Sequence, residues 1–264
     1  MHRPEVNKLY KYRPFSARAL RMLANNELYF AASNAFNDPF DCRARKDFEF
    51  NDNNDLISKM APLEATHQGI AVSEAVAYLK EVTATQDAIQ DYKKRKSELF
   101  QLLVLQSFGI CSFSEIPNDI LMWSHYSDGH KGFCAEFIRT DENMLKWARS
   151  VDYPTNDEFP CIDYWKTKPE EQIEEFTKII LTKSKHWCYE KEWRILDRPS
   201  EIDATYSGHT STYPDSMLSG IIFGARMPQK DRKTIIDILS KKAVSFYEAV
   251  IVKDRFELSV VDIK

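Results

Sequence analysis

Glycine is scarce in this chain, which has 7 glycines among 264 residues. The sequence contains neither a GxGxxG segment nor a GxxxxGK[ST] segment, the two glycine-rich loops that let backbone amides surround a phosphate. A nucleotide site of the Rossmann or P-loop type is therefore not expected.

Cysteines and long apolar runs are also limited. The five cysteines are an odd number, widely spaced and without a CxxC pair, so they favour neither a disulfide framework nor a zinc ribbon. We expect them to be small buried residues in a reducing cytosol. No run approaches the roughly 18 apolar residues of a membrane span, and the first residues lack the apolar segment of a secretory signal. The sequence predicts a soluble cytoplasmic protein that does not contact a membrane.

Neither sign of charge is in large excess. The chain has 36 Lys and Arg and 40 Asp and Glu, which give a net charge of −4. No basic field covers the whole protein, so nucleic acid is not indicated as a partner, although a local basic face stays open. A hydrophobic content of 43% and a charged content of 29% are ordinary for a globular protein and exclude a disordered chain. The oligomeric state stays open.

Alternation and capping signals predict a mixed α+β chain. Residues 9–13 alternate before Pro14 and indicate a strand, Ser16 is typical of a helix N-cap, a helix follows at 17–24, and a strand follows at 27–31. Residues 43–56 look irregular. Further on we expect strands at 109–114, 132–137, 192–196, 218–223, 244–252 and 256–261, and helices within 72–107 and at 119–126, 168–183 and 229–241. The prediction is one domain over 1–264 with a helical insertion at about 55–107.

Seven short phrases resemble one family. They are LYKYR, ELYF, FNDPFD, CSFSE, MWSHYSDGHKGF, YEKEWR and IFGARM. Together they resemble a bacterial family catalogued as domain of unknown function 2971, and the resemblance covers nearly the whole chain. It implies a cytoplasmic bacterial or phage-associated protein, with phage defence as one setting, and lends no agreed activity.

A more distant resemblance comes from the order of Arg13, the pair Ser112 and Ser114, and the pair Glu190 and Glu192. This order resembles the Arg, Ser-x-Ser and Glu-x-Glu signature of one branch of the ADP-ribosyltransferases. The resemblance implies a central, mainly antiparallel split sheet and NAD as substrate, with ADP-ribose passed to an unknown macromolecule or to water. Arg13 would hold the diphosphate through charge-assisted hydrogen bonds, and the serines would shape the nicotinamide pocket.

Three residues are the catalytic candidates of this hypothesis. Glu192 would stabilise the oxocarbenium-like charge that develops as nicotinamide leaves. Glu190, two residues earlier on the expected strand, would face the same cleft and orient the attacking nucleophile. His125 would bind substrate or orient a carboxylate, or else hold a metal together with His130 and a nearby acid.

Other polar and aromatic residues are candidates for contacts with NAD. Tyr12, Tyr29 and Phe113 could stack on nicotinamide, and Asn37 could reach a ribose. Tyr126, beside His125, completes the set. Two alternatives stay open within this hypothesis, because Lys11 could replace Arg13 and Tyr29 could take the part of the serines, as in a related branch.

Two further functions stay open. The same aromatic and acidic residues suit a non-catalytic module that recognises a ligand or a partner. A metal-dependent nuclease is the third hypothesis, with Asp38 or Asp41 and Glu136 or Glu190 around Mg²⁺. The NAD hypothesis itself expects no metal.

Overall fold

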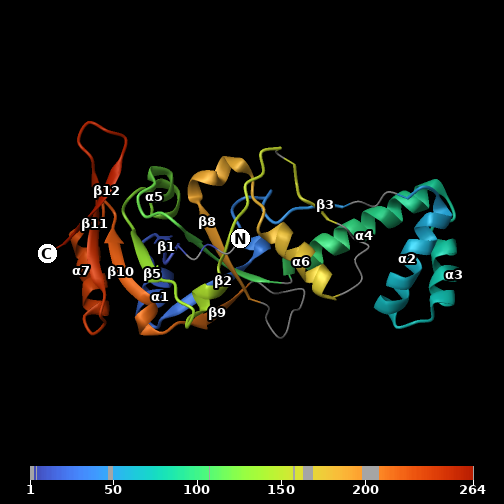
Figure 1. The fold of residues 1–264 in the computed structure, drawn as a ribbon, viewed down its shortest axis with the longest axis horizontal. Coiled ribbons are helices and arrows are strands. Elements are labelled where there is room, and N and C mark those ends of the chain that lie inside the picture. The colour runs from blue at the N-terminus through green and yellow to red at the C-terminus, as the bar shows by residue number, and fades with distance from the viewer. Residues whose placement is uncertain are drawn as a thin grey trace. The chain divides into compact units, whose positions relative to one another are not determined.

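The computed structural model describes residues 3, 5–46, 50–106, 108–156, 158–162, 169–197 and 208–263. The chain forms two compact units (Figure 1). The sheet unit consists of residues 1–39, 106–157 and 183–264, and the helical unit consists of residues 40–105 and 158–182. The single domain expected over 1–264 stays a prediction.

The sheet unit is built on a ten-stranded mixed sheet in the order β12-β11-β10-β5-β1-β4-β2-β9, with β8 paired to β4 and β6 paired to β8. Within the described strands of this sheet, β10 and β11 pair in parallel and the other pairs are antiparallel. The chain is therefore a mixed α+β protein, as predicted. The strands are β1 (Lys8–Arg13), β2 (Glu27–Ala32), β4 (Gly109–Ser114), β5 (Phe133–Ile138), β6 (Arg149–Ser150), β8 (Glu192–Asp197), β9 (Gly208–Thr212), β10 (Leu218–Phe223), β11 (Ser245–Ile251) and β12 (Leu258–Asp262).

Helices cover both faces of this sheet. Successive residues of a strand point to opposite sides, so the core contacts of β5 show which helices lie on each face. On β5, Phe133 and Phe137 lie in one core cluster with Leu23, whereas Cys134 lies in another with Trp123. The first cluster holds α1 and α7, and the second holds α5. The helical elements are α1 (Ala17–Ala24), α5 (Ile120–Tyr126), α7 (Gln229–Leu239) and the 3-10 helices η1 (Ser33–Ala35), η2 (Met144–Trp147), η3 (Lys185–Glu190) and η4 (Asp215–Met217).

The sheet branches at β4. Ser114 pairs with both Tyr10 of β1 and Glu192 of β8, and Ile110 pairs with Ala31 of β2 and also with β8. Because a strand has two edges, β1 and β2 share the edge of β4 that β8 leaves open. They meet it at opposite ends, so β1 and β2 diverge from each other along β4.

The helical unit has its own core. Leu56, Met60, Leu79 and Tyr92 are buried there together, and Glu64 accepts a hydrogen bond from the Tyr92 hydroxyl. No helix in the described ranges is both long enough and apolar enough to cross a membrane. The elements are α2 (Asn53–Gln68), α3 (Val72–Val82), α4 (Gln86–Gln106), α6 (Pro169–Ile180) and the short parallel pair β3 (Arg45–Lys46) and β7 (Cys161–Ile162).

Four expectations from the sequence were wrong. Helix α2 begins at Asn53, inside the stretch expected to be irregular, because Asp52 caps it by accepting from the Asp55 amide. Glu190 ends a 3-10 helix instead of opening a strand, because Lys191 adopts a left-handed backbone with φ 42°. Strand β9 was not expected at all. Cys161 and Cys188 are exposed, so only three of the five cysteines are buried.

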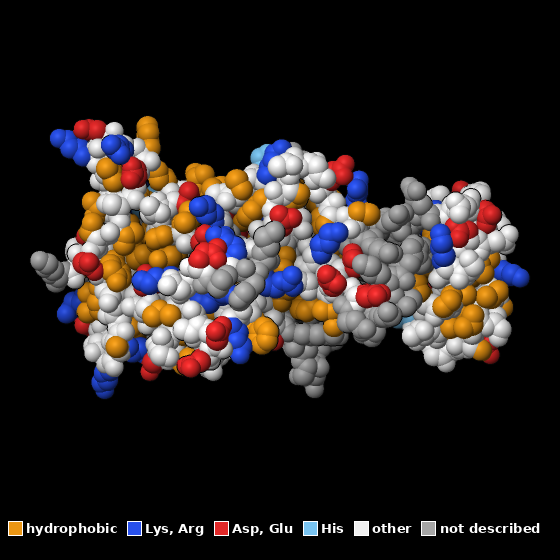
Figure 2. Space-filling view, viewed as in Figure 1, with side chains coloured by type: hydrophobic (Ala, Val, Ile, Leu, Met, Phe, Trp, Pro, Cys, Tyr) orange, Lys and Arg blue, Asp and Glu red, His pale blue; other side chains and the backbone are white. Residues whose placement is uncertain are grey.

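The β11–β12 hairpin ends in an exposed tip. Phe256 is fully exposed, and Arg255 lies at the surface 3.6 Å from Glu257. Hydrophobic, basic and acidic side chains lie together on this tip (Figure 2). Such a surface ion pair contributes little to stability, so Arg255 is a suitable position for a control substitution.

Candidate functional site

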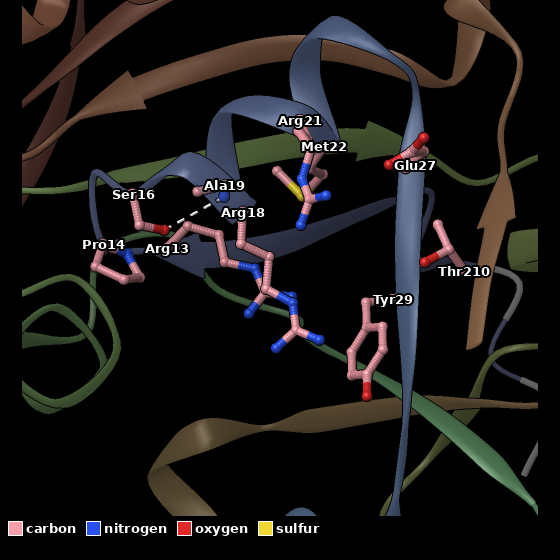
Figure 3. A pocket seen from close by; sticks show the side chains of 10 residues that line it. All are labelled: Arg13, Pro14, Ser16, Arg18, Ala19, Arg21, Met22, Glu27, Tyr29 and Thr210. Atoms are coloured by element: carbon pink, nitrogen blue, oxygen red, sulfur yellow. Dashed lines mark hydrogen bonds between the residues drawn. The ribbon is translucent and has the colours of Figure 1, made fainter. Parts of the chain in front are cut away.

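A pocket of about 450 Å³ lies along α1, at the end of β1 and the start of β2 (Figure 3). We call it the arginine pocket. The described residues that line it are Arg13, Pro14, Ser16, Arg18, Ala19, Arg21, Met22, Glu27, Tyr29 and Thr210.

The local sequence explains why this pocket is polar. Pro14 ends β1 because it has no amide hydrogen to donate, and Ser16 starts α1 by accepting from the Ala19 amide at 3.3 Å. Arg18 and Arg21 are one helical turn apart, so both can reach the same side of α1. Leu23 faces the core, and Met22 packs in the core and also lines the pocket.

Positive charge dominates the arginine pocket. It holds three arginines and one carboxylate, Glu27, whose Oε1 accepts from Asn25 at 3.2 Å. In the part of the chain that the structure describes, none of the three guanidinium groups forms an ion pair with a carboxylate. Guanidinium groups that no carboxylate neutralises are suited to bind phosphate or carboxylate groups of a ligand.

Two of these arginines lie close to each other. The Arg18 guanidinium lies over the ring of Tyr29, 3.7 Å from its centroid, and Figure 3 shows the Arg13 side chain extending toward the same space. Burial lowers the pKa of Arg13, and the positive charge of Arg18 lowers it further, although Cys111 opposes this. The pair therefore lacks an anion that would balance it.

A second polar group is the charge cluster, which we define as Lys183, Glu190, Glu192 and Arg194. The Lys183 ammonium lies 2.5 Å from Glu190 Oε2 and 3.1 Å from Glu192 Oε2. Arg194 donates from Nε to Glu192 Oε1 at 2.8 Å and from Nη2 to Oε2 at 2.9 Å. All four side chains are buried, and their charges cancel.

The two carboxyls of the charge cluster have different proton affinities. Burial raises the pKa of Glu190, and the neighbouring Glu192 adds to the rise, although Lys183 opposes it. Burial alone would also raise the pKa of Glu192, but Arg194 and Lys183, together with a hydrogen bond from Ser112, lower it to about 2. Glu192 is therefore a fixed negative charge, and Glu190 is the carboxyl that takes up a proton first.

The predicted serines lie against this cluster. The Ser112 side chain hydrogen-bonds Glu192, and the Ser114 hydroxyl donates to the backbone oxygen of Glu190 at 2.7 Å. Both serines point to the same side of β4, opposite to Cys111 and Phe113. The structure therefore brings together the Ser-x-Ser and Glu-x-Glu residues, as the sequence hypothesis requires of those two pairs.

Tyr126 and Asn37 extend the same network. The Tyr126 hydroxyl donates to Glu190 Oε1 at 2.6 Å, and the Asn37 side chain hydrogen-bonds Tyr126. His125 is exposed, with its ring centre 6.3 Å from that of Tyr126 and 6.4 Å from that of Tyr189. It lies beside the network without a hydrogen bond to its carboxylates among the described residues.

Arg13 and Tyr29 belong to a different group from the serines and glutamates. They line the arginine pocket, whereas Ser112, Glu190 and Glu192 are not among the described residues that line it. The sequence hypothesis places all of these residues in one cleft. In the described residues, Arg13 and Tyr29 line the arginine pocket, while the serines and glutamates contact one another in the charge cluster.

Tyr12 and Phe113 are core residues. The Tyr12 hydroxyl donates to the backbone oxygen of Ile116 at 2.9 Å, and its ring packs edge-on against Trp123. Phe113 packs edge-on against Phe137, with ring centres 5.7 Å apart. Neither ring lines the arginine pocket, because both are used to fill the two faces of the sheet.

The residues proposed as metal ligands do not gather. His130 stacks on Trp123 and shares a hydrogen bond with the Ser124 hydroxyl at 3.2 Å. Glu136 is bound by Lys8 at 3.0 Å and by Ser219 at 2.8 Å. Across the described ranges, no three His, Cys, Asp or Glu side chains lie close enough together to hold a metal ion.

Reasoning from the sequence missed Arg18, Arg21, Glu27 and Thr210. A usable signal exists for the first two, which follow the strand-ending Pro14 at helical spacing on the side away from the apolar residues of α1. No signal exists for Thr210, because β9 joins the pocket only through its pairing with β2, at Tyr29↔Thr210.

Lys11, the alternative to Arg13, is buried and forms no ion pair within 4.0 Å of a carboxylate among the described residues, although the charge of Glu192 acts on it. Its ammonium donates to the backbone oxygen of Ser112 at 2.6 Å and to Cys111 Sγ at 3.3 Å, and it lies over the ring of Phe113. Burial lowers its pKa to about 8 from an ordinary value of 10.5. Lys11 therefore stays with the core side of β4, away from the serine hydroxyls.

This lowered pKa predicts a dependence of stability on pH. Between pH 8 and 10.5 the unfolded chain keeps the Lys11 proton that the folded chain has lost, so stability rises with pH. We expect this group to add about 3 kcal/mol to the free energy of unfolding across that window. Urea unfolding of the wild type and of Lys11→Met at several pH values measures it. A constant difference between the two proteins from pH 7 to 10.5 would contradict the prediction.

One family model matches the chain. Residues 122–195, from α5 to β8, match a family described as "Protein of unknown function (DUF2971)". This match confirms the family resemblance over a segment that contains the charge cluster and none of the residues lining the arginine pocket. No curated protein and no solved structure matches the chain.

Proposed function

We propose that this protein, whose residues 122–195 match the DUF2971 family, binds a phosphorylated nucleotide of the NAD class in the arginine pocket. The observation that carries this proposal is that three arginines line one pocket without a carboxylate partner among the described residues. Arginine binds phosphate oxygens through paired, charge-assisted hydrogen bonds, and a ligand phosphate would supply the missing negative charge.

Other features of the pocket support a nucleotide. A volume of about 450 Å³ falls in the range of small-molecule sites. The Glu27 carboxylate and the Thr210 hydroxyl can accept hydrogen bonds from ribose hydroxyls, as acidic residues do in other dinucleotide sites. Arg13 sits at the end of β1, the position from which it is expected to hold the diphosphate.

The test is isothermal titration calorimetry with NAD, and with nicotinamide riboside, which lacks the phosphates. We expect NAD to bind the wild type, and Arg13→Gln or Arg18→Gln to weaken binding by about 10-fold or more, because each removes a charge-assisted hydrogen bond. Arg255→Gln removes the same charge at the exposed hairpin tip and should leave the affinity unchanged. Absence of NAD binding, or equal binding by the Arg13 variant, would overturn the proposal.

A second candidate function is the cleavage of NAD at its nicotinamide glycosidic bond by an ADP-ribosyltransferase-like enzyme. The hydrogen bond from Ser112 to Glu192, and the fixed charge of Glu192, favour it. Glu192 would stabilise positive charge on the ribose while the bond to nicotinamide breaks. Water or an acceptor macromolecule would then bond to the ribose carbon and release its proton to Glu190. We also propose that the protein acts in the cytoplasm, in phage defence.

Nicotinamide release separates this second candidate from binding alone. The wild type, with and without cell lysate, should release nicotinamide from NAD, and Glu192→Gln should release it at least about 100-fold more slowly. His186, an exposed residue of η3, provides a control, since His186→Gln should not change the rate. Binding of NAD without release by the folded wild type would favour a non-catalytic binding module.

A further inference from the structure

We propose that the arginine pocket selects ligands with a phosphate monoester, a terminal phosphate carrying two negative charges, over ligands whose phosphates are all diesters. This inference rests on the proposed function because it concerns the same pocket. The ligand class is therefore a nucleotide with a free phosphate end, such as the 2′-phosphate of NADP.

The first step is the closeness of two cations. The side chains of Arg13 and Arg18 extend into the same space beside Tyr29 (Figure 3), and neither has a carboxylate partner in the described part of the chain. Two guanidinium groups so placed repel each other, and the half-buried position of Arg13 adds a desolvation cost. A single phosphate group between them removes both costs at once.

The second step is the contact that the exposed Arg18 makes with Tyr29. Its guanidinium lies 3.7 Å from the centre of the Tyr29 ring, a cation–π contact that orients the group before any ligand arrives. Arg18 also covers that face of the ring, so no base can stack there. The pocket therefore recognises charge more than an aromatic ring.

The third step compares the charges of the possible ligands. A phosphate monoester carries about −1.5 to −2 at pH 7, with a second pKa near 6, whereas each phosphate of a diphosphate diester carries about −1. Two adjacent guanidinium groups match the doubly charged group better. Arg21, exposed on the next turn of α1, adds a third cation to the same pocket.

The charged groups facing this space come from three elements. They are Arg13 from β1, Arg18 and Arg21 from α1, and Glu27 from β2, while β9 contributes the uncharged Thr210. Cys111 of β4 also lies near Arg13. Among these described groups, Glu27 is the carboxyl, so Glu27→Gln is the control variant in the comparison of pH values.

The experiment compares NADP with NAD, a matched pair that differs only by the 2′-phosphate, by calorimetry at pH 8 and pH 5. We expect NADP to bind at least about 10-fold more tightly than NAD at pH 8. At pH 5 the monoester holds an extra proton, so the preference should shrink to a few-fold. In Glu27→Gln the same loss of preference between pH 8 and pH 5 should persist, since it arises in the ligand.

Variants identify the groups responsible. Arg18→Gln should weaken NADP binding more than NAD binding, and Arg255→Gln should leave both affinities unchanged. Equal affinity for NAD and NADP at pH 8 would overturn this inference while leaving the proposed function in place. Absence of binding by either dinucleotide would overturn both.

Discussion

Replacing Arg194 by methionine is expected to lower the free energy of unfolding by about 3–5 kcal/mol. The Arg194 side chain is fully buried and donates two hydrogen bonds to Glu192. Methionine fills much of the same space but leaves the Glu192 carboxylate in the core with less compensation. Urea unfolding followed by circular dichroism at pH 7 measures the loss.

Two controls isolate the buried pair. Arg149 lies opposite Arg194 in the register of β6 with β8 but is exposed, so Arg149→Met should change stability by less than about 0.5 kcal/mol. The double variant Arg194→Met with Glu192→Gln should lose less than the sum of its single variants, because the two side chains interact directly. A loss below about 1 kcal/mol for Arg194→Met would show that Lys183 alone balances Glu192.

Gly132→Ala is expected to cost about 3 kcal/mol and to displace Arg13 from the arginine pocket. A Cβ at this position would lie 2.1 Å from the backbone oxygen of Arg13 and 2.9 Å from the Cα of Pro14. Both are backbone atoms, so the end of β1 must shift away from β5. Thermal and urea unfolding give the stability, and calorimetry with NAD gives the effect on the pocket.

Gly129 supplies the matched control, since it lies in the same turn. Its φ of 58° is left-handed, but an added Cβ would meet nothing within 4 Å. Gly129→Ala should therefore cost only about 1–2 kcal/mol, from backbone strain, and should not alter NAD affinity. Equal losses of stability and affinity in the two variants would show that the close approach of Gly132 to Arg13 does not hold the pocket.

Much of the secondary structure could be predicted because the sheet unit has strong local signals. These signals depend only on neighbouring residues in the sequence. They include the strand before Pro14, the N-cap at Ser16 and the apolar alternation of β5. Strand β9 carries no such signal, since its polar residues Gly208–Thr212 become a strand only by pairing with β2. Helix α2 was partly missed because Pro62 interrupts its sequence pattern.

The candidate site could be predicted only in part, for a related reason. The residues around the charge cluster were found because short motifs carry them, and the contact between Ser112 and Glu192 follows from the pairing of β4 with β8. The sequence hypothesis placed Arg13 in the same cleft as these residues. The order of motifs along the chain does not show that β1 and β2 diverge where they pair with β4. The left-handed Lys191, which places Glu190 outside β8, is likewise set by the surrounding structure.

The branching of the sheet at β4 also sets the order in which the protein can assemble as the ribosome releases it. Strand β1 leaves the ribosome before its partners, since it pairs at Tyr10↔Ser114 and Tyr10↔Glu136, and β2 likewise precedes β9, with which it pairs at Tyr29↔Thr210. Contacts so distant along the chain make folding slow and leave early strands unpaired during translation. Arg13, Arg18 and Tyr29 are thus made long before Thr210, and the wall that Thr210 closes can form only after the chain up to β9 has left the ribosome.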